Sequence, residues 1–167
     1  MYYDRAGGFM TRVAAVTAVL TFLVAAPAQA DVTVFLGANM TPANRAVRGG
    51  AFGIGVLVVA FEAEYAFTPD DPAAKAPALT TGSGNLLLQT PFPIFGFQPY
   101  FTTGGGFYRE TLDTHQDTSF ALNTGGGVKV NLIGPLRLRV DYRVFKLGSG
   151  ALYSPAHRIY AGLNLKL

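Results

Sequence analysis

The sequence of 167 residues contains no cysteine and no tryptophan. Without cysteine, the chain has no disulfide framework, no thiolate nucleophile and no cysteine-anchored lipid. Charged residues are also scarce, at 14% of the chain, whereas roughly 25% is usual for a soluble domain. The formal net charge of +3 is not gathered into a basic run, so we expect no nucleic-acid partner.

One long apolar run is present, and it lies near the N-terminus. Residues 13–26 read "VAAVTAVLTFLVAA" and follow Arg5 and Arg12. A basic segment followed by an apolar run of this length is typical of a secretory signal peptide. Either Met1 or Met10 can serve as the start, because both leave a basic residue ahead of the run.

Small residues follow the run in the way that a signal peptidase requires. Ala28 and Ala30 form an A-x-A site, which predicts cleavage after Ala30. The signal peptide then covers residues 1–30, and residues 31–167 form a single domain. An uncleaved membrane anchor is the alternative, although the run is short of the roughly 20 apolar residues that a spanning helix needs.

The rest of the chain alternates between apolar and other residues. Such a period of two predicts strands with one apolar face, and no helical period appears after residue 30. The predicted strands are residues 31–40, 50–57, 60–67, 85–92, 97–110, 119–132, 136–144 and 157–167.

The connections between these strands alternate in length. Short apolar connections lie at residues 57–60, 91–96 and 132–135, and longer polar ones at 41–49, 68–82, 111–117 and 148–155. Eight strands joined in this way form an antiparallel up-and-down meander, which can close into a barrel without free edges. We therefore predict an all-β, eight-stranded, antiparallel up-and-down barrel.

A soluble barrel places its apolar face inwards, whereas an outer-membrane barrel turns it towards lipid. Lipid outside is favoured by the signal peptide and by long connections that all fall at one end, as in bacterial outer-membrane barrels. Aromatic residues on the apolar face also recur towards strand ends, as in two girdles. Those expected at one rim are Phe52, Phe67, Phe107 and Phe120, and those at the other are Phe92 and Phe97.

The non-apolar face carries a balanced set of charges. Buried charges are costly unless they are paired, and the third and seventh strands face each other across a ring of eight. Glu62 and Glu64 can therefore meet arginines of the seventh strand in bidentate pairs. The predicted lumen network consists of Glu62, Glu64, Glu110, Lys129, Arg137, Arg139, Asp141 and Arg143.

The last strand, "HRIYAGLNLKL", keeps its apolar alternation to the final residue. A closed barrel pairs its last strand with its first, because a free edge in lipid would leave backbone groups unpaired. The tail also resembles the assembly signal of outer-membrane barrels, with Tyr160, Gly162, Leu165 and Leu167 in the matching positions. It departs from that pattern at the final residue, where the family usually has Phe or Trp.

Architecture and tail together resemble the small eight-stranded outer-membrane barrels, the class of the outer membrane protein A barrel and of outer membrane protein X. The resemblance implies an integral protein of the bacterial outer membrane with a lumen filled by polar side chains and four extracellular loops. It implies outer-membrane lipid as surroundings, the barrel-assembly machinery as a partner during insertion, and a monomeric state.

Signs of catalysis or metal binding are weak. A metal site needs three or four converging ligands, and His115 has only Asp113 and Asp117 nearby in the sequence. Ser154 and His157 have opposite strand parity, which does not favour a Ser–His pair on one strand face. We therefore expect no metal, no cofactor and no catalytic residue.

Four functions stay open at this point. The favoured one is a structural or adhesive barrel that acts through its loops, without enzymatic activity. The others are a small porin-like channel, a lipid A-modifying enzyme, and a secreted soluble barrel that binds an apolar ligand.

Overall fold

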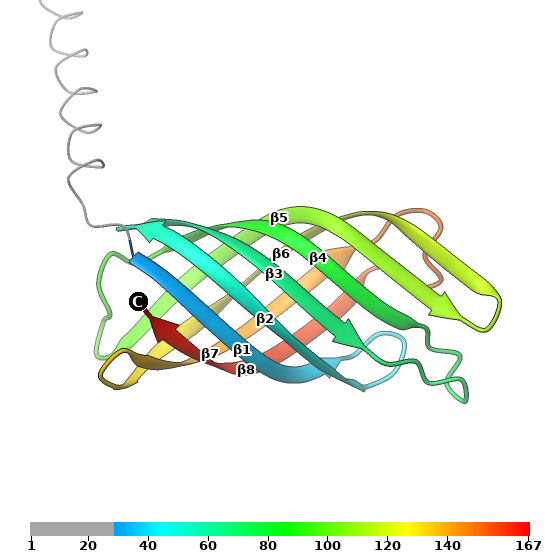
Figure 1. Ribbon diagram of the computed structural model, residues 1–167, viewed down its shortest axis with the longest axis horizontal. Coiled ribbons are helices and arrows are strands. Elements are labelled where there is room, and N and C mark those ends of the chain that lie inside the picture. Colours follow the sequence, from blue (N-terminus) through cyan, green and yellow to red (C-terminus); the bar gives the residue numbers. More distant parts are fainter. Residues whose placement is uncertain (1–28) are drawn as a thin grey trace, which may run out of the picture.

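The structure is a computed structural model that describes residues 29–167. Its eight strands are β1 (Gln29–Asn39), β2 (Arg45–Val56), β3 (Val59–Thr68), β4 (Ala78–Gln89), β5 (Phe97–Leu112), β6 (His115–Ile133), β7 (Leu136–Lys146) and β8 (Ala156–Lys166). Each strand pairs antiparallel with its neighbours in the chain, and β8 pairs with β1 to close the barrel (Figure 1). The predicted all-β, eight-stranded up-and-down barrel is confirmed.

The predicted signal peptide falls almost entirely outside the described residues, and so does Ala28. Ala30 lies within β1, where its carbonyl oxygen accepts a hydrogen bond from the Leu167 backbone N–H at 2.8 Å. Cleavage after Ala30 stays a prediction.

The alternation of side chains sets the inside and the outside of the barrel. Phe61 is 68% exposed, whereas the next residue, Glu62, is 3% exposed. Along the other strands, too, apolar side chains point outwards and polar side chains point inwards, the reverse of a soluble protein. Large apolar side chains therefore cover the exterior. Exposed examples are Val34, Leu36, Ile54, Leu88, Phe101, Leu122, Tyr142 and Leu163. The interior is lined mainly by polar and charged side chains.

The two ends of the barrel differ, and we name them by what they carry. The terminal end carries Gln29, the C-terminus and the connections 57–58, 90–96 and 134–135. The loop end carries the connections 40–44, 69–77, 113–114 and 147–155. Strands β5 and β6 extend furthest at the loop end (Figure 1).

Several strand boundaries differ from the sequence prediction, and the largest differences lie at the loop end. Strand β4 starts at Ala78 and not at Asn85, and β5 and β6 continue to a turn at residues 113–114. The connection at the opposite end, 90–96, is therefore longer than the 113–114 turn. In the extra part of β4, the outward positions include Thr80, Gly82 and Gly84, so the sequence shows no apolar alternation there.

One predicted girdle residue also lies elsewhere. Phe52 pairs with Val32 and Ala63, near the middle of the sheet and away from the rim. Phe107 and Phe120 do lie towards the loop end, where their rings meet edge to face with centroids 6.0 Å apart. Among residues 29–167, no helix is long and apolar enough to cross a membrane.

Candidate functional site

The middle of the lumen holds a layer of paired charges centred on Glu62. Arg139 bonds both Glu62 oxygens through its two terminal nitrogens, Nη2 lying 3.2 Å from Oε1. Arg143 Nη2 donates to the same Oε1 at 2.8 Å. Glu62 comes from β3 and the two arginines from β7, so the pairs cross the lumen.

Glu64 makes a second set of pairs one inward position further along β3. Its Oε2 lies 3.1 Å from Arg143 Nη1, and its Oε1 accepts a hydrogen bond from Arg158 Nη1 at 3.3 Å. The Tyr160 hydroxyl donates to Glu64 Oε2 at 3.0 Å. Strands β3, β7 and β8 are thus tied together through one carboxylate.

Asp141 completes this layer between the two arginines of its own strand. Arg139 Nη2 donates to Asp141 Oδ2 at 3.0 Å, and Arg143 Nε donates to Oδ1 at 3.0 Å. The Tyr100 hydroxyl of β5 also bonds Asp141. We call the six charged residues the polar layer, and they are Glu62, Glu64, Asp141, Arg139, Arg143 and Arg158.

The polar layer is both neutral and almost inaccessible to solvent. Three carboxylates face three guanidinium groups, and each of the six residues is at most 4% exposed. Charges removed from water in this way are stable only when partners and hydrogen bonds compensate for lost hydration. The bidentate arginine geometry provides that compensation, and it fills the cross-section with side chains.

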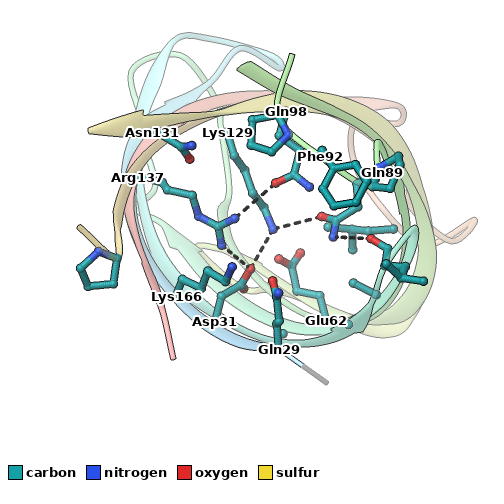
Figure 2. A pocket seen from close by; sticks show the side chains of 18 of the residues that line it. Gln29, Asp31, Glu62, Gln89, Phe92, Gln98, Lys129, Asn131, Arg137 and Lys166 are labelled. Carbon is teal, nitrogen blue, oxygen red and sulfur yellow. Dashed lines mark hydrogen bonds and ion pairs between the residues drawn. The ribbon is translucent and has the colours of Figure 1, made fainter. Parts of the chain in front are cut away.

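The terminal end of the lumen opens into a cavity of about 620 Å³, whose mouth is drawn in Figure 2. Asp31 lies at its centre, with its Oδ2 2.7 Å from Lys129 Nζ and 3.2 Å from Arg137 Nη2. Arg137 also donates to Gln98 Oε1 at 3.3 Å. Glu62 lines the cavity as well, so the cavity ends against the polar layer.

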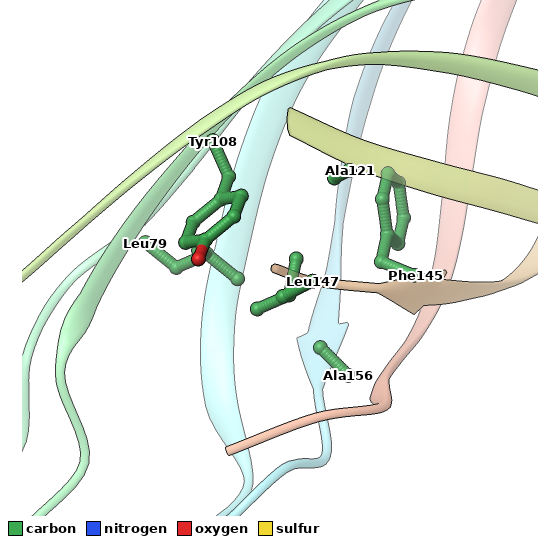
Figure 3. Close-up of a cluster of buried hydrophobic side chains, with 6 residues drawn as sticks. All are labelled: Leu79, Tyr108, Ala121, Phe145, Leu147 and Ala156. Carbon is green, nitrogen blue, oxygen red and sulfur yellow. The ribbon is translucent and has the colours of Figure 1, made fainter. Parts of the chain in front are cut away.

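The loop end of the lumen is closed by an apolar cluster (Figure 3). The Arg158 guanidinium lies 4.4 Å from the centroid of the Phe145 ring, which places the cluster directly against the polar layer. The members of the cluster are Leu79, Tyr108, Ala121, Phe145, Leu147 and Ala156.

Connections at the loop end are tied to the barrel by hydrogen bonds. The Leu152 backbone N–H, in connection 147–155, donates to Glu110 Oε1 at 3.1 Å. Arg45 Nη2 donates to the Thr41 carbonyl oxygen at 3.0 Å, and its Nη1 donates to the Pro69 carbonyl oxygen at 3.0 Å. Arg45 thereby joins connection 40–44 to connection 69–77.

The eight charges predicted for the lumen all point inwards, but they lie at three levels. Five of them meet in the polar layer. Lys129 and Arg137 lie in the terminal-end cavity and pair with Asp31, so Arg137 is not a partner of Glu62 or Glu64. Glu110 is buried near the loop end, where it accepts the hydrogen bond from Leu152.

Sequence reasoning missed three charged residues of the lumen. Arg158 shares the inward parity of Tyr160, and Asp31 shares that of Thr33, so both could have been found from the strand period. Arg45 lay in a predicted loop, because the alternation at the start of β2 is interrupted by Arg48 on the outward face.

Three residues of the predicted assembly signal lie in β8, on either its inward or its outward face, and the fourth, Leu167, follows directly after the strand. Tyr160 is buried and stacks on Phe35, with ring centroids 4.0 Å apart. Gly162 leaves room for Phe35, because a Cβ at that position would lie 2.7 Å from the Phe35 Cβ. Leu165 and Leu167 are exposed on the exterior. Their role in assembly stays a prediction.

The residues considered for catalysis have separate partners. Ser154 Oγ accepts a hydrogen bond from the Leu147 backbone N–H at 3.0 Å. His157 Nδ1 lies 2.7 Å from the Tyr142 hydroxyl on the barrel exterior. Within the described part of the chain, no three His, Asp or Glu side chains are grouped so that they could hold a metal ion.

No protein-family model matches the chain, and no curated protein matches it by sequence. Solved structures do match it. The N-terminal β-barrel domain of Pseudomonas aeruginosa OprF aligns with a TM-score of 0.66 at 14% identity, over 83% of this chain and 97% of that one. Neisserial surface protein A aligns with a TM-score of 0.61 at 17% identity, over 84% and 96%.

A third similar structure is the Yersinia pestis outer membrane protein Ail in a phospholipid bilayer nanodisc. It aligns with a TM-score of 0.53 at 11% identity, over 84% of this chain and 100% of that one. These matches span nearly the whole of each solved barrel and agree with the strand number and closure described above. The chain has the fold of the small eight-stranded outer-membrane β-barrels.

Proposed function

We propose that the protein is an integral barrel of the bacterial outer membrane that acts through its loop-end surface, in a structural or adhesive role. The observation that carries the proposal is the arrangement of side chains: apolar residues cover the exterior, while paired charges fill the interior. A barrel with this arrangement is matched to lipid outside, and it would expose a large apolar surface if it were placed in water.

The polar layer favours a closed barrel rather than an open channel. Its arginines and carboxylates fill the lumen between β3 and β7, and the apolar cluster lies between this layer and the loop end. An eight-stranded barrel has an interior just wide enough for its side chains. Passage of ions would require both obstacles to rearrange.

The partner of the loop-end surface is a separate question. Ail from Yersinia pestis has been crystallised with the heparin analogue sucrose octasulfate. Connections 69–77 and 113–114 of this chain carry Asp70, Asp71 and Asp113 against one cation, Lys75. This acidic balance does not suit a polyanion, so we favour a neutral or basic partner surface.

Cell fractionation tests the proposal, with each fraction run on a gel before and after boiling. We expect the protein in the outer-membrane fraction, with a mobility that changes once heat unfolds the barrel. A band in the soluble periplasmic fraction without a heat-dependent shift would contradict the membrane location and favour a soluble barrel.

An enzymatic role is the main competitor and predicts altered lipid A. Deletion of the gene should leave the mass spectrum of lipid A unchanged, because Ser154 and His157 are bonded to Leu147 and Tyr142 and not to each other. Identical lipid A masses in the deletion and wild-type strains would support the structural role. A reproducible mass shift between the two strains would favour the enzyme.

A further inference from the structure

An open groove of about 680 Å³ runs over the exterior of the barrel. It crosses β7, β8, β1, β2 and β3. Its lining includes Gly50 and Ala161, neither of which carries a long side chain. Its walls include Val34, Leu36, Tyr65, Leu138 and Leu163.

The groove has one charged residue, Arg48, and this residue lies towards the loop end. Arg48 is exposed on the outward face of β2, between Leu36 of β1 and Phe67 of β3. Its guanidinium group lies 5.5 Å from the centroid of the Phe67 ring. The Arg48 guanidinium group forms no hydrogen bond or ion pair with any of residues 29–167.

The position of Arg48 differs from that of other outward-facing cations. Lys146 is the last residue of β7, and Arg109 pairs with Thr118 in the part of the β5–β6 hairpin that extends beyond β7. Arg48 instead lies among paired, apolar strand positions. A cation at such a place is costly in hydrocarbon, and it is stabilised when its long side chain reaches an anionic group at the interface.

We propose that this groove binds lipid A of the outer leaflet, with acyl chains along the groove and a phosphate on Arg48. The inference rests on the proposed membrane location, which places the loop end and therefore Arg48 in the outer leaflet. Guanidinium groups bind phosphate in bidentate geometry. A groove that crosses five strands accommodates several chains from one headgroup, as lipid A presents them.

Binding can be measured by native mass spectrometry of the purified protein in detergent, titrated with bisphosphorylated, hexa-acylated lipid A. Arg48→Ala should weaken lipid A binding about tenfold, since hydrogen bonds to charged groups contribute enough for that factor. Arg109→Ala is the matched control, because it removes an outward cation away from the groove, and its affinity should equal that of the wild type.

The apolar part of the groove is tested by filling it. Gly50→Leu should lower the lipid A affinity by a similar factor. The fold should tolerate this change, because a Cβ at Gly50 meets only the Thr33 carbonyl oxygen, at 3.3 Å. Gly82→Leu is the control, because Gly82 faces outwards on β4 and a Cβ there has no neighbour within 4 Å. All variants are first checked for folding by the heat-dependent gel shift. If Gly50→Leu does not fold, Gly50→Ala takes its place.

Three results would overturn the inference. The first is unchanged lipid A affinity in folded Arg48→Ala and Gly50→Leu. The second is equal affinity of the wild type for phosphatidylglycerol, which would make the site a general phospholipid contact. The third is a dimer that Gly50→Leu abolishes, which would make a second copy the occupant. None of these affects the proposed location, whereas a soluble protein in the fractionation would remove both proposals.

Discussion

At the scale of single residues, Glu62 occupies the position on which the polar layer depends most. It receives hydrogen bonds from both Arg139 and Arg143, so its charge compensates two buried guanidinium groups. Replacement by a neutral amide leaves these cations with too little negative charge in a site from which water is excluded. Removing one partner of a buried pair in this way is strongly destabilising.

We expect Glu62→Gln to lower the free energy of unfolding by about 3 kcal/mol. The measurement is a urea titration in detergent, in which the heat-dependent gel shift reports the folded fraction. Glu110→Gln is the matched control: Glu110 is buried too, but it accepts only a backbone hydrogen bond from Leu152. A smaller loss is expected there, and equal losses for the two variants would argue against the special position of Glu62.

Gly127 is a second residue whose identity is imposed by its neighbours. A Cβ at this inward position of β6 would lie 2.5 Å from the Tyr100 hydroxyl oxygen, and closer still to the Val140 carbonyl oxygen. The missing side chain lets Tyr100 of β5 pass over Gly127 and reach Asp141 of β7. The glycine-rich segment of β6 is therefore shaped by the polar layer.

Gly127→Leu should lower the free energy of unfolding by about 3 kcal/mol or prevent barrel formation, because neither backbone oxygen nor ring can move away easily. The same urea titration measures the loss. Gly82→Leu adds the same side chain on the exterior, where nothing obstructs it, and should be nearly neutral. A stable Gly127→Leu barrel would show that Tyr100 is not confined as described.

At the scale of strands and turns, the connection between β2 and β3 consists of Leu57 and Val58. Leu57 has φ +51°, in the left-handed region that non-glycine residues rarely adopt. A turn of two residues between antiparallel strands needs positive φ angles to match the strand twist. The backbone conformation of Leu57 is therefore imposed by the turn.

Leu57→Gly should raise the free energy of unfolding by about 1 kcal/mol, since glycine adopts this region without the steric cost that a Cβ adds. Val58→Gly tests the neighbouring turn position, whose φ is not positive, and should give no gain. Midpoints of urea unfolding compare the two variants with the wild type. An increase for Val58→Gly alone would place the strain elsewhere in the turn.

Strand number and orientation could be predicted because alternation is a local property of the sequence. Strand ends could not be predicted so well. In β4, the residues Thr80, Gly82 and Gly84 face outwards and give no apolar signal. In the β5–β6 hairpin, pairing continues beyond the apolar belt, where side chains are polar on both faces and the period disappears.

The contents of the lumen could be predicted as a set but not as pairs. Sequence parity placed Glu62 and Arg139 inside, and ring geometry placed their strands opposite each other. The stagger between strands determines which charges lie at one level, and the sequence does not show that stagger. It moves Arg137 to the terminal end beside Asp31, and it brings Arg158 to Glu64.

At the scale of the whole molecule, the lumen contains an open terminal-end cavity, the polar layer and the apolar cluster in succession. We expect the purified wild-type protein to produce no stable conductance steps in planar lipid bilayers, because the polar layer and the cluster obstruct the path in series. A trimeric porin added to the same bilayer serves as the positive control. Regular, long-lived conductance steps from the wild-type protein would show that the lumen opens.

The central claim is that the apolar exterior of the barrel faces lipid, and a spin label at Phe61 tests it most directly. Phe61 is the third residue of β3, lies between Ile54 and Leu86 on the barrel exterior and is 68% exposed. The chain has no native cysteine to interfere. A nitroxide is attached to Phe61→Cys in protein reconstituted into bilayers, with Lys75→Cys in connection 69–77 as the water-exposed control. We expect dissolved oxygen, but not a water-soluble nickel chelate, to relax the label at position 61, and the chelate to relax it at position 75. Equal relaxation of both labels by the nickel chelate would contradict the membrane-embedded barrel.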